Sequence, residues 1–520
     1  MGVRRDNKAV LLLSVALAGM AVLIVEIAAT RMLAPFFGNS IYTLSSVIGC
    51  VLAALGLGYY AGGALADRRP SARWFFAVIA LGGFAVLLLQ LLNAVLLPAV
   101  GYRLSLVHGP LVVSALMFFL PAFFLAMLSP FAIALLHARA AGGGVGNASG
   151  QVFFWSTLGS IVGSLGTGFV LIPKFGIGSI LLGVGAGLVL LGSAGLALAR
   201  ARPRVVPLAL ALAGIASGGA LWQLAVPQLN GAVYAADGVY DRIVIRDIAY
   251  RGRVARVLWQ DLGVSGGQFL DDGRMAFDYT KYYELYRLFT PELKTALAIG
   301  GGAYTVPRAI LRKSPHAVVD VAEIDPVLHR LAVRYFALPD DARLRNHVLD
   351  GRRFLHDAAG GYDLIFADAY HSLISAPPQF ATREFFELAQ RRLADNGVLI
   401  SNYYGSLAAD SRASIYAELR TLRSVFPQVY AIATTDAASD ELQNFILIGH
   451  KAVPASRRID LRRAADIDFD DPLLKTVADR ELRPSDAELA AYPVLTDDYA
   501  PLEYYAAAAI RRYDALARGR

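Results

Sequence analysis

The sequence predicts an α-helical transmembrane bundle of about seven spans fused to an α/β Rossmann-like domain, with a small antiparallel β unit ahead of that domain. Hydrophobic residues make up 56% of the chain, and nearly uncharged runs fill its first 226 residues. Beyond them, short apolar strands alternate with helical segments, and the glycine turn AIGGGAY follows one of these strands. We therefore expect a membrane part (1–226), a β unit with a lead-in helix (227–290), and an α/β domain with a C-terminal extension (291–520).

Seven apolar runs make up the membrane part. Each has roughly the 20 residues that a helix needs to cross the hydrocarbon of a bilayer. The runs lie at about 9–30, 41–66, 74–97, 110–136, 150–172, 177–199 and 205–226. The fifth is rich in Gly and Ser, which let helices approach closely in lipid. Glu26, the one acidic residue well inside a run, is interpreted either as functional or as a partner of Arg31.

Charge is divided unevenly between the two halves. Of 49 Lys and Arg and 42 Asp and Glu, residues 1–226 hold 13 and 3, which leaves 36 and 39 for the remainder. The basic excess thus belongs to the membrane part, where it sets topology, and we expect no nucleic-acid partner. The single cysteine, Cys50, excludes a disulfide framework. The first apolar run is too long for the core of a cleavable signal peptide, so none is expected.

The soluble half begins with YDRIVIRDIAYRGRVARVLWQD, whose alternating polarity predicts the small β unit. MAFDYTKYYELYRLF has helical spacing and many aromatic residues. The strands that follow are predicted in TALAIGGGAY, HAVVDVAEID, HVLDGRRFL, YDLIFADAY and GVLISNYYG. Because helical segments separate them, we expect a doubly wound, mostly parallel sheet.

Candidate ligand-binding residues occur where these strands end, at Gly300 to Ala303, Glu323, Asp350 and Asp368. Ligands of doubly wound sheets lie at the carboxyl ends of the strands. Glycines let the backbone approach a ligand closely, and a carboxylate at a strand end can accept both hydroxyls of a ribose. The alternative interpretation is that Glu323 and Asp350 only cap the helices that follow.

The sequence lacks the residues that several other chemistries require. No Walker lysine follows the glycines, so phosphate cradling is not expected there, and the spacing GGGAYTVP departs from the dinucleotide pattern. The histidines show no metal-ligand spacing, so no metal is expected. No nucleophile elbow is present to anchor a hydrolase triad.

Taken in order, these segments resemble the spermidine synthase family, the polyamine aminopropyltransferases, over roughly 234–450. EIAATRMLAPFFGNSIYTLSSVIG and VLTDDYAPLEY are similar to the membrane-attached branch of that family. The matching positions are Asp278, Tyr282 and Glu284 in D-E-F-x-Y-H/Q-E, Gly300, Gly301 and Gly302 in G-G-G-D-G, Glu323 and Asp325 in V-E-I-D, Asp350, Gly351 and Phe354 in G-D-G-x-x-F, and Tyr362, Asp363, Ile365 and Asp368 in Y-D-x-I-x-x-D.

The resemblance implies a class I methyltransferase-type fold and a transfer of the aminopropyl group from decarboxylated S-adenosylmethionine to an amine such as putrescine, with release of methylthioadenosine. It implies Asp368 as the base, Tyr282 as the residue that positions the amine, Glu323 on the ribose and Asp350 on the adenine. An amine with a pKa of about 10 arrives protonated and needs such a base. The alternative for Tyr282 is core packing in a stripe of tyrosines. Further positions expected at the site are Gly300, Gly301, Gly302, Asp325 and Gly351 for the donor, and Asp278, Tyr283, Glu284 and His371 for the acceptor.

Three departures leave other functions open. The aspartate of G-G-G-D-G is Ala303 here, the His or Gln before Glu284 is Tyr283, and the second aspartate of the family's D-S-S-D-P is His371. An ammonium without a carboxylate partner is poorly held. The donor could therefore be intact S-adenosylmethionine, used by a lyase or a methyltransferase. A transporter with a nucleoside-sensing domain is a third hypothesis. The late acidic residues Asp497, Asp498 and Glu503 could hold an amine, or form a solvated helix start.

Location and assembly are the last expectations. Ten basic residues lie on the N-terminal side of the predicted spans and three on the other side, which places the N-terminus in the cytoplasm. Seven spans would then put the α/β domain outside, whereas the adenosyl donor is cytosolic. We expect a multi-pass protein of the inner membrane, in contact with the lipid bilayer. We favour a cytoplasmic catalytic domain, against the charge rule, and a homodimer is one expected assembly.

Overall fold

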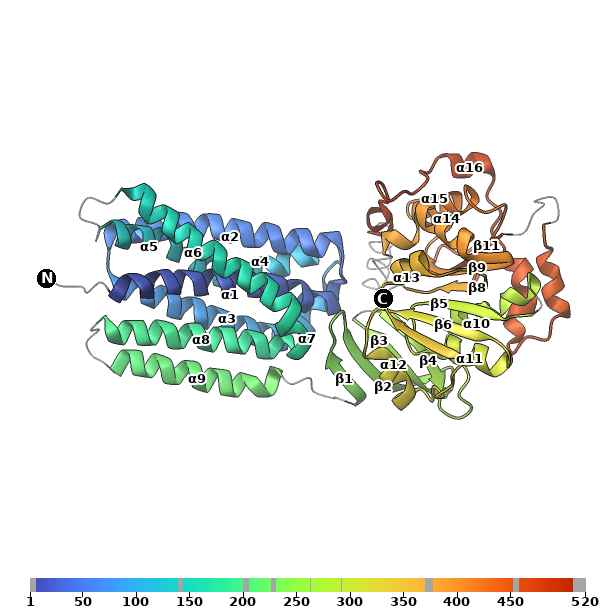
Figure 1. The fold of residues 1–520 in the computed structure, drawn as a ribbon, viewed down its shortest axis with the longest axis horizontal. Coiled ribbons are helices and arrows are strands. Elements are labelled where there is room, and N and C mark those ends of the chain that lie inside the picture. The colour runs from blue at the N-terminus through green and yellow to red at the C-terminus, as the bar shows by residue number, and fades with distance from the viewer. Residues whose placement is uncertain are drawn as a thin grey trace. The chain divides into compact units, whose positions relative to one another are not determined.

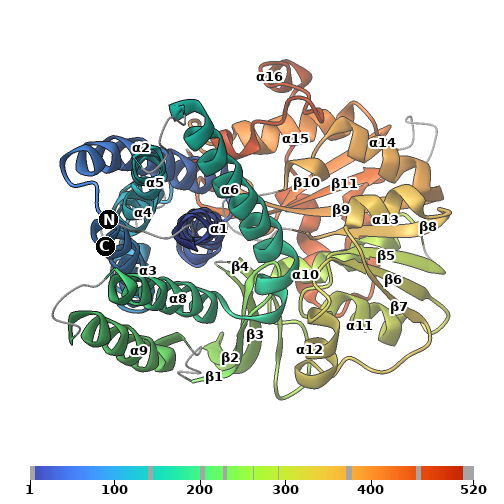
Figure 2. The same cartoon turned by 60° about the vertical axis from the view of Figure 1, so that its left-hand side comes forward.

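The computed structural model describes residues 6–138, 144–199, 205–225, 231–261, 263–290, 292–369, 377–451 and 458–507. The chain divides into two compact units. One is formed by the N-terminal helices together with Ala236–Asp241, and the other contains Leu229–Ala235 and everything from Arg242 onward. Figures 1 and 2 show the elements of both units.

The N-terminal unit is helical. Its elements are α1 (Asp6–Phe37), α2 (Ile41–Arg68), α3 (Ala72–Val100), α4 (Gly109–Ala126), α5 (Leu128–His137), α6 (Val145–Gly166), α7 (Ile172–Lys174), α8 (Ile177–Leu198) and α9 (Val205–Ala225), with short turns η1 (Gly101–Arg103) and η2 (Thr167–Leu171) between them. Among the described residues, six helical segments are long and apolar enough to cross a membrane. The seventh expected run forms α9, whose described apolar stretch, Pro207–Leu221, is shorter, so seven spans stay a prediction.

Small residues let helices of this unit touch backbone to backbone. A Cβ atom added to Gly159 of α6 would lie 1.9 Å from the carbonyl oxygen of Ala16 in α1, and one on Gly163 would lie 2.5 Å from that of Met20. Helix α1 also contacts α2, α4, α5 and α8, so it occupies the centre of the bundle in Figure 2. Such contacts suit association in lipid, where packing replaces the hydrophobic effect between helices.

A four-stranded sheet follows in the order β1 (Ala232–Asp237), β2 (Arg242–Tyr250), β3 (Arg253–Gln260) and β4 (Gly263–Phe269), and β3 pairs antiparallel with both β2 and β4. A short helix α10 (Asp278–Lys281) and a 3-10 helix η3 (Tyr282–Leu288) follow it. The structure thus contains the small β unit and the lead-in helix that the sequence predicts, although the helix is shorter than expected and tightens after its first turn.

A seven-stranded mixed sheet forms the Rossmann-like, class I methyltransferase-type core, in the order β10-β11-β9-β8-β5-β6-β7. Its strands are β5 (Thr295–Ile299), β6 (Val318–Glu323), β7 (Leu344–Val348), β8 (Tyr362–Ala367), β9 (Leu393–Gly405), β10 (Gln428–Ala433) and β11 (Gln443–His450). Strands β7, β6, β5, β8 and β9 pair in parallel, and β11 runs antiparallel to both of its neighbours. The strand order reverses at β5, and ligands of such sheets lie beside this reversal.

Helices cover both faces of the sheet (Figure 1). Helices α11 (Thr305–Lys313) and α12 (Leu328–Tyr335) pack on one face, and α13 (Gly351–Asp357), α14 (Arg383–Arg392) and α15 (Ala413–Arg423) pack on the other. Strand β5 supplies Ala296 and Ala298 to the first core and Leu297 and Ile299 to the second. Burial on both faces explains why this strand reads as an unbroken apolar run. The remaining elements are η4 (Pro378–Phe380), η5 (Leu461–Asp466), η6 (Pro472–Arg480) and α16 (Asp486–Ala490).

Candidate active site at the carboxyl edge of the sheet

The glycine turn after β5 passes through a narrow space between β4 and the end of β8. Gly300 has φ +88°, and a Cβ atom there would lie 2.5 Å from the backbone oxygen of Asp368. Gly302 has φ +51°, and its Cβ atom would lie 2.2 Å from the backbone oxygen of Ser265. Only glycine combines a left-handed conformation with such close approach. The amide of Ala303 donates to the same Ser265 oxygen at 2.9 Å, and the Ala303 side chain is buried against Gly266.

Glu323, the last residue of β6, ties this turn to the neighbouring strand. One of its carboxylate oxygens accepts a hydrogen bond from the amide of Gly301 at 2.8 Å, and the other accepts one from the amide of Asp325 at 2.8 Å. Asp325 in turn accepts from the amide of Val327, at the start of α12. Glu323 therefore faces the glycine turn, and Asp325 supports the segment that leads into the next helix.

Asp368 directly follows β8 and lies beside the glycine turn. Its amide donates to the carbonyl oxygen of Ile299 at 2.9 Å. Its Oδ1 accepts from Nδ2 of Asn402 at 2.9 Å, and Oδ1 of Asn402 accepts from Nδ2 of Asn444 at 2.9 Å. Burial raises the pKa of Asp368 to about 6, and the Asn402 hydrogen bond opposes that rise. A carboxylate with this pKa is ionised at neutral pH and can accept a proton there.

Tyr279 of α10 is a tyrosine whose hydroxyl is influenced by the charge of Asp368. Burial raises the pKa of its hydroxyl well above 10, and the negative charge of Asp368 raises it further. The sequence did not single out this residue, because four tyrosines occur within eight positions and their spacing alone does not say which one faces the sheet edge. A neutral tyrosine hydroxyl beside a carboxylate can position an amine by hydrogen bonding.

The lead-in residues that the sequence placed at the acceptor site have other partners. Tyr282 is fully buried, and its hydroxyl accepts from Nη1 of Arg480 at 2.7 Å. Tyr283 is buried and stacks on Tyr286. The carboxylate of Glu284 contacts Nζ of Lys313 at 2.5 Å, and that of Asp278 contacts Arg251 at 2.7 Å and Lys281 at 2.8 Å. These contacts support the core-packing interpretation of Tyr282.

Asp350 and Gly351 lie at the start of α13, next to β5. Oδ1 of Asp350 accepts from the amide of Arg353 at 2.9 Å, so Asp350 is the N-cap of this helix. A Cβ atom on Gly351 would lie 2.3 Å from Cγ2 of Ile299, the residue before the glycine turn. The helix can approach β5 only because a glycine stands at 351. Capping and adenine binding are compatible uses of Asp350. His371 lies outside the described residues.

The C-terminal segment is attached beside α13. Arg352 forms a bidentate ion pair with Asp497 at 2.6 and 2.7 Å, and the hydroxyl of Thr382 donates to Asp497 at 2.8 Å. A planar guanidinium and a carboxylate bind strongly in this arrangement. Asp497 therefore fastens the C-terminal segment to the helix that Asp350 caps.

Tyr304 is a further residue that sequence reasoning missed. It follows the glycine turn with φ +55°, a left-handed conformation that is strained for a bulky residue. Its buried hydroxyl donates to Oδ1 of Asn346 on β7 at 2.5 Å. Its ring fills the space beside Gly301, where a Cβ atom would meet the ring at 2.5 Å. Such strain persists only where the surrounding structure holds it, and it is enriched at functional sites.

The C-terminal part of the chain is similar to known proteins. Residues 284–456 match the sequence model of the spermine/spermidine synthase domain. The polyamine aminopropyltransferase of Vibrio vulnificus (strain CMCP6) is 33% identical over 163 residues, which are 31% of this chain and 52% of the relative. The N-terminal histidine N-methyltransferase of Emericella nidulans is 30% identical over 189 residues, 34% of this chain and 30% of the relative. The matches to such curated relatives cover 26–64% of the relatives' own length.

Among solved structures, a probable spermidine synthase from Corynebacterium glutamicum ATCC 13032 has a TM-score of 0.40 at 21% identity, covering 50% of this chain and 92% of that one. A spermidine synthase from Thermotoga maritima has a TM-score of 0.36 at 17% identity, covering 53% and 87%.

Proposed function

We propose that this chain, whose C-terminal part carries a spermine/spermidine synthase domain, is a membrane-bound aminopropyltransferase. The donor would be decarboxylated S-adenosylmethionine and the acceptor a diamine such as putrescine. The products would be methylthioadenosine and a longer polyamine. The proposal follows the names of the curated relatives and the residues at the carboxyl edge of the sheet.

The observation that carries the proposal is that the carboxyl ends of β5, β6 and β8 lie next to one another. Gly300 lies against the backbone of Asp368, and the amide of Gly301 donates a hydrogen bond to the carboxylate of Glu323. A nucleoside-accepting turn, a carboxylate suited to a ribose and a carboxylate suited to a proton therefore share one edge of the sheet. Gly351 packs against Ile299, the residue before the glycine turn, so Asp350 and Gly351 lie at the same edge. We expect the adenine ring to bind beside Asp350.

The transfer breaks the bond between the sulfonium sulfur and the aminopropyl carbon, and forms a bond between that carbon and the acceptor nitrogen. The sulfur keeps the electron pair of the broken bond, and the acceptor nitrogen loses one proton. Asp368 is the group that receives this proton, because its pKa of about 6 leaves it ionised at neutral pH. Tyr279, whose hydroxyl is influenced by the charge of Asp368, would position the amine. Since the leaving group is already good, orientation supplies much of the rate.

The helical unit supports a membrane location, because six of its described helical segments meet the length and hydropathy of a span. Several large apolar side chains on α2 and α6 are exposed, among them Leu52 and Phe154, as lipid-facing residues are. We propose that the catalytic unit faces the cytoplasm, where the adenosyl donor is made.

The direct test uses the purified full-length chain with decarboxylated S-adenosylmethionine and a series of diamines. Mass spectrometry should detect methylthioadenosine and the lengthened polyamine in equal amounts, and Asp368→Asn should lower the rate of both by about 10²–10⁴-fold. Absence of a lengthened amine with every diamine tried would reject the transferase.

A second candidate is another S-adenosylmethionine enzyme, a lyase or a methyltransferase. The observation that favours it is Ala303, whose methyl group is buried against β4 where the family has a carboxylate for the aminopropyl ammonium. Methylthioadenosine formed without any acceptor would identify the lyase. Adenosylhomocysteine formed from intact S-adenosylmethionine would identify the methyltransferase.

A further inference from the structure

A cavity of about 190 Å³ lies apart from the candidate active site. The lead-in helices α10 and η3 contribute Lys281 and Glu284 to its wall. Neither the glycine turn nor Glu323, Asp350 or Asp368 lines it. The cavity is therefore a second, separate place where a ligand could bind, whether or not the chain is the transferase proposed above.

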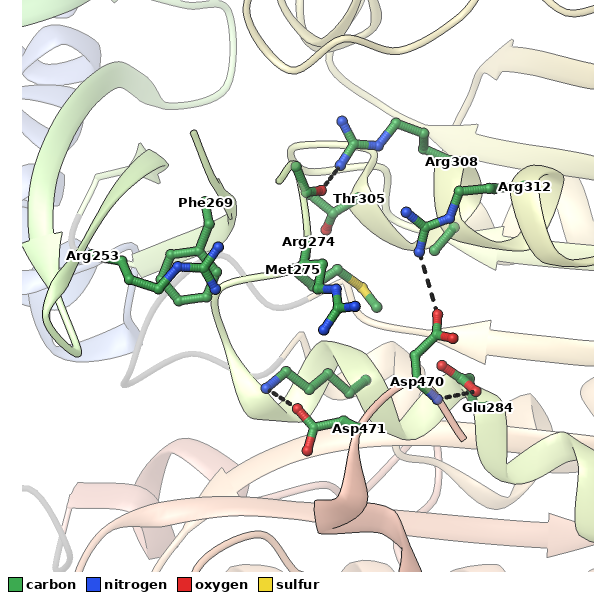
Figure 3. A pocket seen from close by; sticks show the side chains of 13 residues that line it. Arg253, Phe269, Arg274, Met275, Glu284, Thr305, Arg308, Arg312, Asp470 and Asp471 are labelled. Carbon is green, nitrogen blue, oxygen red and sulfur yellow. Dashed lines mark hydrogen bonds and ion pairs between the residues drawn. The ribbon is translucent and has the colours of Figure 1, made fainter. Parts of the chain in front are cut away.

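Basic and apolar side chains enclose this cavity from two sides (Figure 3). Arg308 and Arg312 project from α11 on one side, and Arg274 and Met275 project from the turn that follows β4. Phe269 closes one end, where the guanidinium of Arg253 lies 3.8 Å from the centre of its ring. The cavity thus has a basic face and an apolar end wall.

The carboxylates that line the cavity already have basic partners. Lys313 contacts Glu284 at 2.5 Å and Asp470 at 2.7 Å, and Lys281 contacts Asp471 at 2.7 Å. Paired carboxylates of this kind have their charge largely balanced. They give the cavity little attraction for a cationic ligand.

Two lining arginines have no close ion pair in the described part of the chain. Arg308 donates to the carbonyl oxygen of Phe336 at 2.5 Å, to that of Gly273 and to the side chain of Gln268, and it forms no ion pair within the described part of the chain. Burial lowers its pKa, and the nearby charge of Arg312 lowers it further. Arg274 has only a distant ion pair, 3.7 Å from Asp272. Because the guanidinium of Arg308 is partly buried without a counter-charge, it favours an anion.

We propose that this cavity binds a phosphate-bearing anion, held by Arg274 and Arg308 and bordered by Phe269 and Met275. A guanidinium group matches the geometry of a phosphate and can donate two parallel hydrogen bonds to two of its oxygens. A cavity of about 190 Å³ has room for a small anionic group such as phosphate or diphosphate. The phosphate could belong to a soluble metabolite or to a phospholipid head group.

The first test is calorimetric titration of the full-length chain in detergent with inorganic pyrophosphate. The wild type should bind saturably, and Arg274→Gln should bind about tenfold or more weakly, a loss of ~1.4 kcal/mol or more. Arg391→Gln, an equally exposed arginine on α14, is the matched control and should bind like the wild type. Arg308→Lys, which keeps the charge but loses the fork, should also weaken binding.

Thermal unfolding without ligand checks that each variant is folded. Arg274 is well exposed, with only the distant ion pair to Asp272, so its replacement should leave the unfolding temperature nearly unchanged. The proposal is overturned if the wild type shows no saturable binding of pyrophosphate up to about 10 mM. A Kd above that concentration corresponds to a binding free energy of less than about 3 kcal/mol. It is equally overturned if Arg274→Gln binds pyrophosphate as tightly as the wild type.

A second arm identifies the source of the phosphate. The full-length chain is placed in bilayer discs of phosphatidylcholine alone or with phosphatidylglycerol, and pyrophosphate titrations are repeated. A soluble ligand predicts equal pyrophosphate affinity in both discs. A lipid ligand predicts weaker apparent affinity with phosphatidylglycerol, and this difference should vanish in Arg274→Gln. Either result supports the phosphate site and assigns its source.

Discussion

Nδ2 of Asn402 donates a hydrogen bond to Oδ1 of Asp368 at 2.9 Å. A second hydrogen bond fixes the orientation of the Asn402 amide, because its Oδ1 accepts from Nδ2 of Asn444 at 2.9 Å. The three side chains belong to the neighbouring strands β8, β9 and β11 or to the residue that follows one of them. Asp368 therefore has one oxygen engaged by the sheet, while its ionised form is stabilised against burial.

Asn402→Ala should shift the pH dependence of catalysis. The raised pKa of Asp368, about 6 in the wild type, means that activity falls as pH drops through 6, because the base becomes protonated. A hydrogen bond to a charged group contributes about 1.5–3 kcal/mol, so its removal should raise that pKa by roughly 1–2 units. The acidic limb of kcat/KM against pH should move to higher pH, and Asn396→Ala, an exposed position, should not move it. An unchanged limb would argue against the role of Asn402.

Asp368→Asn should lower kcat by about 10²–10⁴-fold, the usual contribution of a general base. The nucleoside should still bind within a few-fold of the wild type, because Glu323 and the glycine turn are unaltered. Asp395→Asn, on an exposed part of β9, serves as the control with wild-type turnover. Single-turnover kinetics together with calorimetry of the donor would separate the two effects. Full activity of Asp368→Asn would remove this residue from the mechanism.

Two tyrosines should behave in opposite ways. Tyr279→Phe removes the hydroxyl close to Asp368 and should raise KM for the amine while the unfolding temperature stays near that of the wild type. Tyr282→Phe leaves buried Arg480 without one acceptor and should cost about 1–3 kcal/mol of stability, with normal turnover per folded molecule. Thermal unfolding and steady-state rates measured for both variants distinguish a positioning role from a structural one. The reverse pattern would return the positioning role to Tyr282.

Glu418 of α15 should destabilise the fold as pH rises. Both of its carboxylate oxygens are buried with no hydrogen-bond partner in the described chain, and burial raises its pKa well above 4.5. The folded form thus retains a proton that the unfolded chain releases above pH 4.5, so stability declines from there towards the folded pKa. Glu418→Met should raise the unfolding temperature more at pH 8 than at pH 5. Glu387→Met, at a side chain that is 46% exposed, should show no such difference. An equal effect of Glu418→Met at both pH values would contradict this account.

Much of the sheet edge could be predicted from the sequence because its signals are local. A buried apolar strand followed by glycine or a carboxylate occurs at Gly300, Glu323 and Asp368, and parallel strands bring such ends together. The partners of these groups could not be predicted in the same way. Asn402 reaches Asp368 from 34 residues away, and Asn444 bonds Asn402 from a further 42 residues along the chain. Arg480 reaches Tyr282 from 198 residues away. The short α10 and its change to a 3-10 helix also redirect the tyrosines, which helical spacing alone does not show.

The burial of Ala303 against β4 has a consequence for engineering. Its methyl group faces Gly266, where an added Cβ atom would stand 3.1 Å away, so the wall behind position 303 is already filled. Restoring an aspartate there would require the new carboxylate to turn away from that wall or the wall to be rebuilt with it. Under the proposed function, we therefore expect donor preference to depend on both segments, so that conversion between donors would call for paired exchanges rather than a single substitution.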